Sequence, residues 1–147
     1  MKVCEGRITS KFGFRVHPIT KEKKFHNGVD IGCAEGTAVY SPVDAIVAQA
    51  YNHKTGGNTL ILRCADTNDR YAFAHLKEIL VEPNKRIKKG TLIAYSGDTG
   101  ASTGAHLHFG RAVCGYWKDN VCYEFEYIDP TSMIEFDEFL PRAMETR

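Results

Sequence analysis

The chain has 147 residues, of which 43% are hydrophobic and 11% aromatic, so it can bury one hydrophobic core and is not a disordered protein. Lys and Arg together number 19 against 18 Asp and Glu, and the net charge of +1 gives no electrostatic argument for binding nucleic acid or an anionic membrane. No apolar run approaches the ~18 residues of a membrane span, and the first residues lack the apolar core of a signal peptide. We therefore expect one domain that acts as a monomer, with no nucleic-acid partner and no membrane insertion.

Short apolar segments alternate with clusters of turn residues along the chain, a pattern typical of antiparallel β-structure. The predicted strands lie, in chain order, within residues 7–20 (interrupted at Gly13 and ended by Pro18), in the turn-to-strand segment 25–32, in two pieces of 37–51, and at 59–64, 70–76, 91–95, 106–112 and 121–127. The charged segments 21–24 and 81–89 are predicted to be loops, and a short helix is expected around 132–139. The sequence thus predicts a mainly β fold with an antiparallel sheet at its core.

The five cysteines include no Cys-x-x-Cys pair, which excludes a zinc site built from cysteines. Most of them are expected to be reduced and buried. Cys114 and Cys122 are different, because they flank a predicted hairpin turn at 116–120 and can lie across it from one another. The strand register is not fixed by the sequence, so their pairing stays open at this point.

Two histidines separated by one residue occupy the segment Gly104–Gly110. On a strand, His106 and His108 project from one face while Leu107 and Phe109 project from the other. If the apolar face is buried, two imidazoles are held at the opposite face, where they can serve as two metal ligands or as one ligand and a base. The alternative is a pair of ordinary half-buried histidines bonded to the backbone.

Three further residues with metal-binding or acid–base chemistry fall at strand ends or beside turns: His26, Asp30 and His75. A catalytic zinc site needs three nitrogen or oxygen ligands and an open position, which two histidines and one aspartate would supply. Zinc acidifies a water molecule and polarises a carbonyl oxygen. The two remaining histidines can then act as a general base and as donors to a developing oxyanion. Spacing alone leaves His106 and His108 interchangeable.

Taken in order, these residues carry a family resemblance. The motifs are Phe12-Gly13-x-Arg15-x-His17-Pro18, then His26-x-x-x-Asp30, then Ala74-His75-Leu76, then Gly100-x-Ser102-Thr103-Gly104-x-His106-x-His108-Phe109. Their combination resembles the lysostaphin-type (LytM) peptidoglycan endopeptidases from about residue 6 to about residue 112. The resemblance implies a zinc-dependent hydrolase, a metalloprotease that cuts peptide bonds in the stem peptides or cross-links of bacterial peptidoglycan, with one Zn²⁺ per chain.

The resemblance also implies a role for each site residue. His26, Asp30 and His108 match the zinc ligands of the family, and His75 and His106 match its two catalytic histidines. The implied fold is an antiparallel sheet that forms the floor of a groove walled by loops, here 21–25, 51–58 and 96–105.

Three residues are candidates for contact with substrate in that groove: Arg15, His17 and Asn58. We expect the peptidase domain to span residues 1–128, and the segment 129–147 to be a C-terminal tail that packs on the domain or trails it.

Two other functions are compatible with such a sequence. A non-catalytic relative would be a cell-wall binding module or an activator of another hydrolase, but that class is identified by missing ligands, and all five positions are filled here. A sugar-transport phosphocarrier also pairs histidines on a β fold, yet Asp30 would repel a phosphoryl group on a neighbouring histidine.

The cellular setting is a separate expectation. A compact wall hydrolase without a signal peptide would suit a phage endolysin, a virion-associated domain, or a domain excised from a longer exported protein. Each of these would act at the bacterial cell wall or in the periplasm. Which peptide bond is cut depends on groove contacts that spacing does not define.

Overall fold

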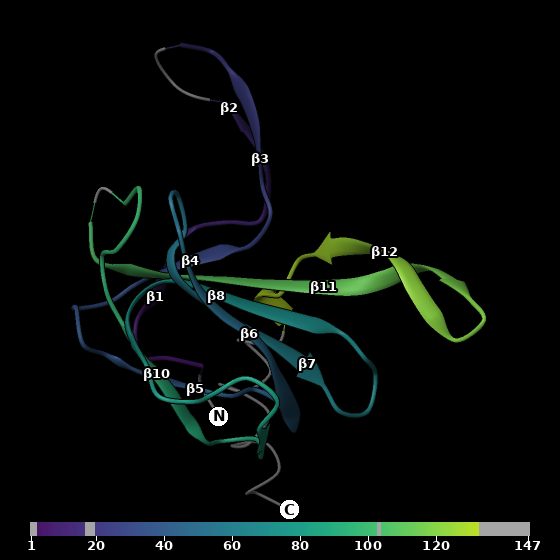
Figure 1. The fold of residues 1–147 in the computed structure, drawn as a ribbon. Coiled ribbons are helices and arrows are strands. Elements are labelled where there is room, and N and C mark those ends of the chain that lie inside the picture. The colour runs from purple at the N-terminus through teal and green to yellow at the C-terminus, as the bar shows by residue number, and fades with distance from the viewer. Residues whose placement is uncertain (1–2, 17–19, 103, 133–147) are drawn as a thin grey trace, which may run out of the picture.

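The structure is a computed structural model that describes residues 3–16, 20–102 and 104–132, and strands dominate it (Figure 1). The strands are β1 (Arg7–Ser10), β2 (Gly13–Val16), β3 (Lys23–His26), β4 (Val29–Gly32), β5 (Ala38–Tyr40), β6 (Ala45–His53), β7 (Gly57–Cys64), β8 (Arg70–Ile79), β9 (Arg86–Ile87), β10 (Leu92–Ser96), β11 (His106–Lys118) and β12 (Val121–Ile128). The mainly β, antiparallel prediction is confirmed. The expected helix around 132–139 lies, beyond its first residue, outside the described residues.

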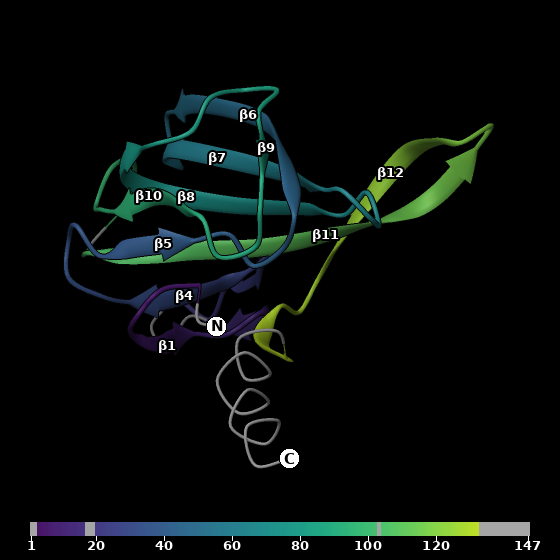
Figure 2. The same ribbon diagram turned by 90° about the horizontal axis from the view of Figure 1, so that it is seen from below.

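One large antiparallel sheet organises the molecule. Its strands follow the order β1-β4-β11-β8-β7-β6-β9, while β10 pairs with β5 and β8, and β12 pairs with β11. Strands β5 and β10 lie across one face of this sheet (Figure 2). The opposite face is the one that carries the histidines of β11.

The core lies between the large sheet and the β5–β10 layer. Its fully buried members include Val39 of β5 and Ile93 of β10, which belong to the same cluster as Leu60, Phe73 and Phe109 of the large sheet. Burying a side chain of this size contributes about 1.5–3 kcal/mol of stability. This burial fixes the register of β11, because a slip by one residue would turn its histidines into the core.

Two hairpins project from the sheet in Figure 1. The first, β2–β3, forms its own two-stranded sheet. Phe25 of β3 packs edge-on against Phe14 of β2 at 5.0 Å between ring centroids, and against Phe12, just before β2, at 5.1 Å. The second is β11–β12, whose turn residues Asp119 and Asn120 both have positive φ angles, 53° and 64°, as a two-residue hairpin turn requires.

Cys114 and Cys122 form a disulfide across the β11–β12 hairpin, with their Cα atoms 5.8 Å apart. The three other cysteines, Cys4, Cys33 and Cys64, are free, as expected.

Two predicted loops contain strands. The segment predicted as a charged loop at 21–24 enters β3 at Lys23, because Lys23 and Lys24 pair with Val16 and Arg15 of β2. Likewise, β9 falls within the predicted loop 81–89 and pairs with β6. Both strands are exposed on their charged side, so neither shows the apolar alternation that identifies a strand. No helix in the described part of the chain is long and apolar enough to span a membrane.

Candidate metal centre

The candidate metal centre forms where β3, β4 and β11 meet. His26 ends β3, Asp30 lies in β4, and His108 of β11 is directly opposite Asp30 in the antiparallel register. The neighbours of these residues, Val29 and Phe109, are fully buried. Because side chains alternate between faces, burying those neighbours turns Asp30 and His108 to the opposite face of the sheet.

The three side chains converge on one point. Asp30 Oδ1 lies 3.1 Å from His108 Nδ1 and 3.3 Å from His26 Nε2, and the two histidine nitrogens are 3.3 Å apart. One ligand atom from each residue falls within 4.8 Å of the others. The side chains are 10–18% exposed, so the centre is largely, but not completely, shielded from solvent.

The surroundings of Asp30 favour the ionised form of its carboxyl group. Burial of Asp30 acts to raise its pKa, but the hydrogen bond from His108 and the nearby charges of His26, His108 and His106 outweigh burial and hold the pKa below its ordinary value. The carboxyl group is therefore ionised at neutral pH and available to a cation.

Backbone groups orient the two histidine ligands. His26 Nδ1 lies 2.9 Å from the carbonyl oxygen of Lys11; a carbonyl can only accept, so Nδ1 carries the proton and Nε2 presents its lone pair to the centre. The ring of His108 rests against the backbone of Gly28. A Cβ atom at Gly28 would come within 2.9 Å of His108 Nε2 and 2.5 Å of the Phe109 carbonyl oxygen, so the ring needs a glycine there.

His75 and His106 stand beside the centre, with their ring centroids 4.8 Å apart. His75 Nδ1 is 2.7 Å from the carbonyl oxygen of Thr99, and His106 Nδ1 is 2.7 Å from that of Gly104. Both Nδ1 atoms therefore donate, which leaves each Nε2 as an acceptor. Nε2 of His106 lies 3.6 Å from Asp30 Oδ1, so it faces the candidate ligands.

The backbone of His75 is unusual, with a φ of 60°. This left-handed conformation is costly for a residue with a Cβ atom and persists only where its surroundings impose it. Here the N–H of His75 donates to the carbonyl oxygen of Gly56 at 2.7 Å, while the ring is tied to Thr99. The strained backbone turns the imidazole out of β8 toward His106.

These groups line a groove of about 510 Å³. Its lining residues are Arg15, His26, Asn27, Asp30, Thr55, Gly56, Ala74, His75, Ala101, Ser102, His106 and His108. Two of the predicted loop walls, 51–58 and 96–105, contribute to it through Thr55 and Ser102 and their neighbours. The third, 21–25, does not.

The candidate substrate residues are placed differently from one another. Arg15 lines the groove, whereas His17 lies outside the described residues. Asn58 is not among the lining residues, and its side-chain amide is engaged elsewhere. It donates to the carbonyl oxygen of Leu76 at 3.0 Å and accepts from Asn52 at 2.8 Å, so it ties β7 to β8 and β6.

Sequence reasoning missed the residues that act through their backbone. Thr99 and Gly56 hold His75 through carbonyl oxygens, and Gly28 makes room for His108 by lacking a side chain. Every residue has a backbone carbonyl oxygen, so the residue type does not show which of them accepts a hydrogen bond from a histidine. The glycine directly between His26 and Asp30 was the one available indication.

Comparison with known proteins gives a consistent result. The pattern of a family described as "Peptidase family M23" matches residues 24–119. The peptidoglycan DD-endopeptidase ShyA of Vibrio cholerae is 38% identical over 110 residues, which are 74% of this chain and 25% of that protein. This chain thus spans about a quarter of that relative's length.

Two solved structures share the fold over most of their length. The structure of LytU is matched with a TM-score of 0.73 and 33% identity, over 89% of this chain and 86% of that one. The catalytic domain of lysostaphin from Staphylococcus simulans is matched with a TM-score of 0.70 and 28% identity, over 87% of this chain and 92% of that one.

Proposed function

Because the chain belongs to peptidase family M23, we propose that it is a zinc-dependent endopeptidase that hydrolyses peptide bonds in the stem peptides or cross-links of bacterial peptidoglycan. The observation that carries this proposal is the convergence of His26, Asp30 and His108 within 4.8 Å, beside a second pair of histidines in one groove. ShyA, the 38% identical relative, is by name a peptidoglycan DD-endopeptidase, which supports the substrate class.

The donor set fits zinc. Two imidazole nitrogens and one carboxylate oxygen are the ligands that catalytic zinc sites use, with a further position left for water or substrate. His26, Asp30 and His108 would hold one ion per chain. The structure of a zinc-containing peptidase from Vibrio cholerae matches 72% of this chain and 33% of that one, with 38% identity. When bound, zinc supplies a Lewis acid that polarises the scissile carbonyl and makes a water molecule more acidic.

His75 and His106 are proposed to handle protons and charge in the groove. Each is locked by a backbone carbonyl into the tautomer with a free Nε2, so each can accept a proton from an attacking water or, once protonated, donate to the oxyanion or the leaving amine. Because the rings lie 4.8 Å apart, one histidine can act on each side of the same scissile bond.

The substrate defines the place of action. Peptidoglycan lies in the bacterial cell wall, so we propose that the chain acts there, as a phage endolysin, a virion-associated domain, or one domain of a longer exported protein.

The experiment is to measure zinc content and the release of cross-link peptides from purified peptidoglycan, before and after chelation and zinc add-back. We expect about one zinc per chain and hydrolysis that is lost on chelation and restored by zinc. Folded protein that neither binds zinc nor releases peptides would refute the proposal and favour a cell-wall binding or hydrolase-activator module.

A further inference from the structure

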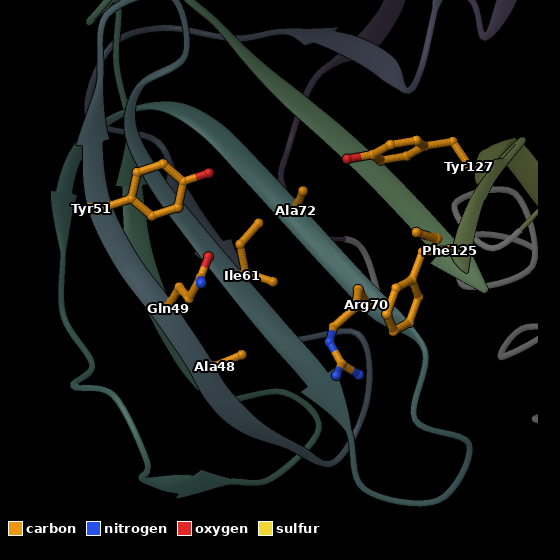
Figure 3. A pocket seen from close by; sticks show the side chains of 9 residues that line it. Ala48, Gln49, Tyr51, Ile61, Arg70, Ala72, Phe125 and Tyr127 are labelled. Carbon is orange, nitrogen blue, oxygen red and sulfur yellow. The ribbon is translucent and has the colours of Figure 1, made fainter. Parts of the chain in front are cut away.

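A second cavity, of about 420 Å³, opens on the same face of the sheet as the metal centre. Figure 3 shows its floor, formed by Ile61 and Ala72, and its opposite walls, formed by Tyr51 of β6 and Tyr127 of β12. The hydroxyl ends of the two tyrosines extend toward Ala72 from opposite sides (Figure 3). Nothing in the function proposed above uses this cavity.

The cavity continues the catalytic groove along two strands. Across β11 and β8, His108 pairs with Ala74, Gly110 with Ala72, and Ala112 with Arg70. The first pair lines the groove and the last pair lines the cavity. Four residues of strand separate them, which is about 13 Å at ~3.3 Å per residue. An extended peptide of about four residues would therefore reach from one to the other.

The wall on the β12 side lies outside the segment matched by the family pattern, which ends at residue 119. Phe125 and Tyr127 line the cavity. Because side chains alternate between the two faces of a strand, Glu124 and Glu126 project from the opposite face of β12. The acidic side chains are thus directed away from the cavity, which presents aromatic rings together with the polar groups of Gln49 and Arg70.

Arg70 is the charged group of this cavity. Its guanidinium lies over the ring of Phe125, 4.7 Å from the centroid, and donates to the backbone and side-chain oxygens of Asn68 at 2.6 and 3.0 Å. Burial, and then the charge of Arg63, lower the pKa of Arg70, and the charge of Asp69 opposes this shift. The net direction shows that the cation is only partly compensated where it lies.

Arg63 reinforces this positive charge. It is directly opposite Arg70 in the β7–β8 register, and side chains of paired residues share a face, so two like charges are adjacent. Across residues 3–16, 20–102 and 104–132, no carboxylate lies within 4.0 Å of either guanidinium. Asp69, the neighbouring acid, is engaged by Arg111 at 2.8 Å.

We infer that this cavity is a substrate subsite in which Arg70, backed by Arg63 and stacked on Phe125, binds a free carboxylate of the peptidoglycan stem peptide. A guanidinium on an aromatic platform is a strong, directional carboxylate donor. Stem peptides contain glutamate linked through its side-chain carboxyl, which leaves the α-carboxyl free. The inference rests on the proposed function, because it assigns this second cavity to the same substrate.

The test uses the zinc-loaded protein and two soluble cross-linked stem-peptide dimers, one with free α-carboxylates and one in which these are carboxamides. The variant is Arg70→Gln, and Arg86→Gln on β9 is the matched control, since Arg86 is exposed on the edge strand. We expect the natural protein and the control to have an about tenfold lower KM for the free carboxylate. Arg70→Gln should lose that preference, with kcat nearly unchanged.

The outcomes separate the two proposals. If the natural protein hydrolyses neither dimer, the proposed function fails. If it hydrolyses both dimers with equal KM, or if Arg70→Gln weakens both equally, the inference is overturned while the proposed function stands. A purely structural role of Arg70, through its bonds to Asn68, would produce the equal loss.

Phe125→Ala provides an independent variant should Arg70→Gln fail to fold. Phe125 is 38% exposed, so its removal leaves the core intact but takes away the platform of the guanidinium. We expect a smaller loss of the carboxylate preference, about threefold. An unchanged preference in this variant would contradict the subsite.

Discussion

The sheet face that carries the groove has two ends, which are built in different ways. The metal end holds the candidate metal centre, and the β12 end holds the second cavity. At the metal end, each of His26, His75 and His106 is bonded through Nδ1 to a backbone carbonyl, at 2.7–2.9 Å. At the β12 end, Phe125 and Tyr127 remain 38% and 45% exposed, on a hairpin that projects from the sheet (Figure 1).

This difference separates two tasks. Chemistry on a peptide bond needs groups held to within a fraction of an ångström, which the carbonyl bonds and the buried strand register provide. Selection among substrates tolerates more adjustable surfaces. The metal end falls within the M23-matched segment and the β12 wall falls outside it. We therefore expect substitutions at the two ends to affect different measured quantities.

The largest effect is expected from the candidate ligands. Asp30→Ala or His108→Ala removes one of three donors and leaves a site that no longer closes around a cation. We expect loss of both zinc and hydrolysis, with activity lower by at least ~10³-fold. Zinc content by elemental analysis and peptide release are measured on the same sample.

Asp66→Ala, in the exposed turn between β7 and β8, is the matched control and should retain both zinc and activity. Full activity in Asp30→Ala would show that the three residues are not the metal site.

The next effect concerns His75 and His106. Replacing either by Ala leaves the three ligands in place but removes an Nε2 that faces the groove. We expect hydrolysis to fall by about 10²–10⁴-fold, the range for a lost general acid or base, while most of the zinc is retained. A His75→Ala protein that is folded but free of zinc would mean that a ligand has been mistaken for a proton-transfer group.

The third effect is on zinc affinity, and it is tested at two glycines. An added Cβ atom crowds a candidate ligand at Gly28, whereas at Gly36 it only strains the backbone. Gly28→Ala places a Cβ atom 2.5 Å from the Phe109 carbonyl oxygen and 2.9 Å from His108 Nε2, so the ligand must shift. We expect zinc affinity to fall by about 10–100-fold, the range for a lost supporting contact.

Gly36→Ala is the comparison, because its Cβ atom would meet open space at a φ of +87°. It should cost about 1–2 kcal/mol of stability and leave zinc affinity unchanged. Equal zinc affinities in the two variants would contradict the role of Gly28.

The metal end was the more predictable of the two regions. The alternation of histidines with Leu107 and Phe109 predicts that both histidines project from one face of β11. Leu107 and Phe109 are buried, at 0% exposure, which keeps the histidines on the opposite face. The role of each ligand followed from the family resemblance rather than from spacing, which left His106 and His108 interchangeable. In the structure their Nδ1 atoms have different partners, since Nδ1 of His108 faces Asp30 and Nδ1 of His106 faces a carbonyl, and which of the two binds the metal stays a prediction.

The β12 end could not be predicted in the same way. The strand at 121–127 was correctly predicted, but the cavity depends on Phe125 of β12 reaching Arg70 of β8, a contact between residues distant in the sequence that no local pattern encodes. Arg70 is likewise an ordinary strand residue in the sequence. Its significance comes from three non-local facts: Arg63 opposite it, Phe125 beneath it, and the engagement of Asp69 by Arg111.

The smallest effect tests whether the two ends are separable. In the double variant Cys114→Ser and Cys122→Ser, the β11–β12 hairpin loses its crosslink. This crosslink closes a short loop and stabilises the fold by about 2–3 kcal/mol, because it restricts the unfolded chain. The histidines of β11 lie at the other end of that strand and keep their pairing with β4. Zinc content and hydrolysis of the carboxamide dimer should therefore match the natural protein, while KM for the free-carboxylate dimer rises by about two- to threefold as the Phe125 platform loosens. Loss of zinc in this variant would show that the hairpin and the metal centre form one cooperative unit, and the division of tasks between the two ends would fail.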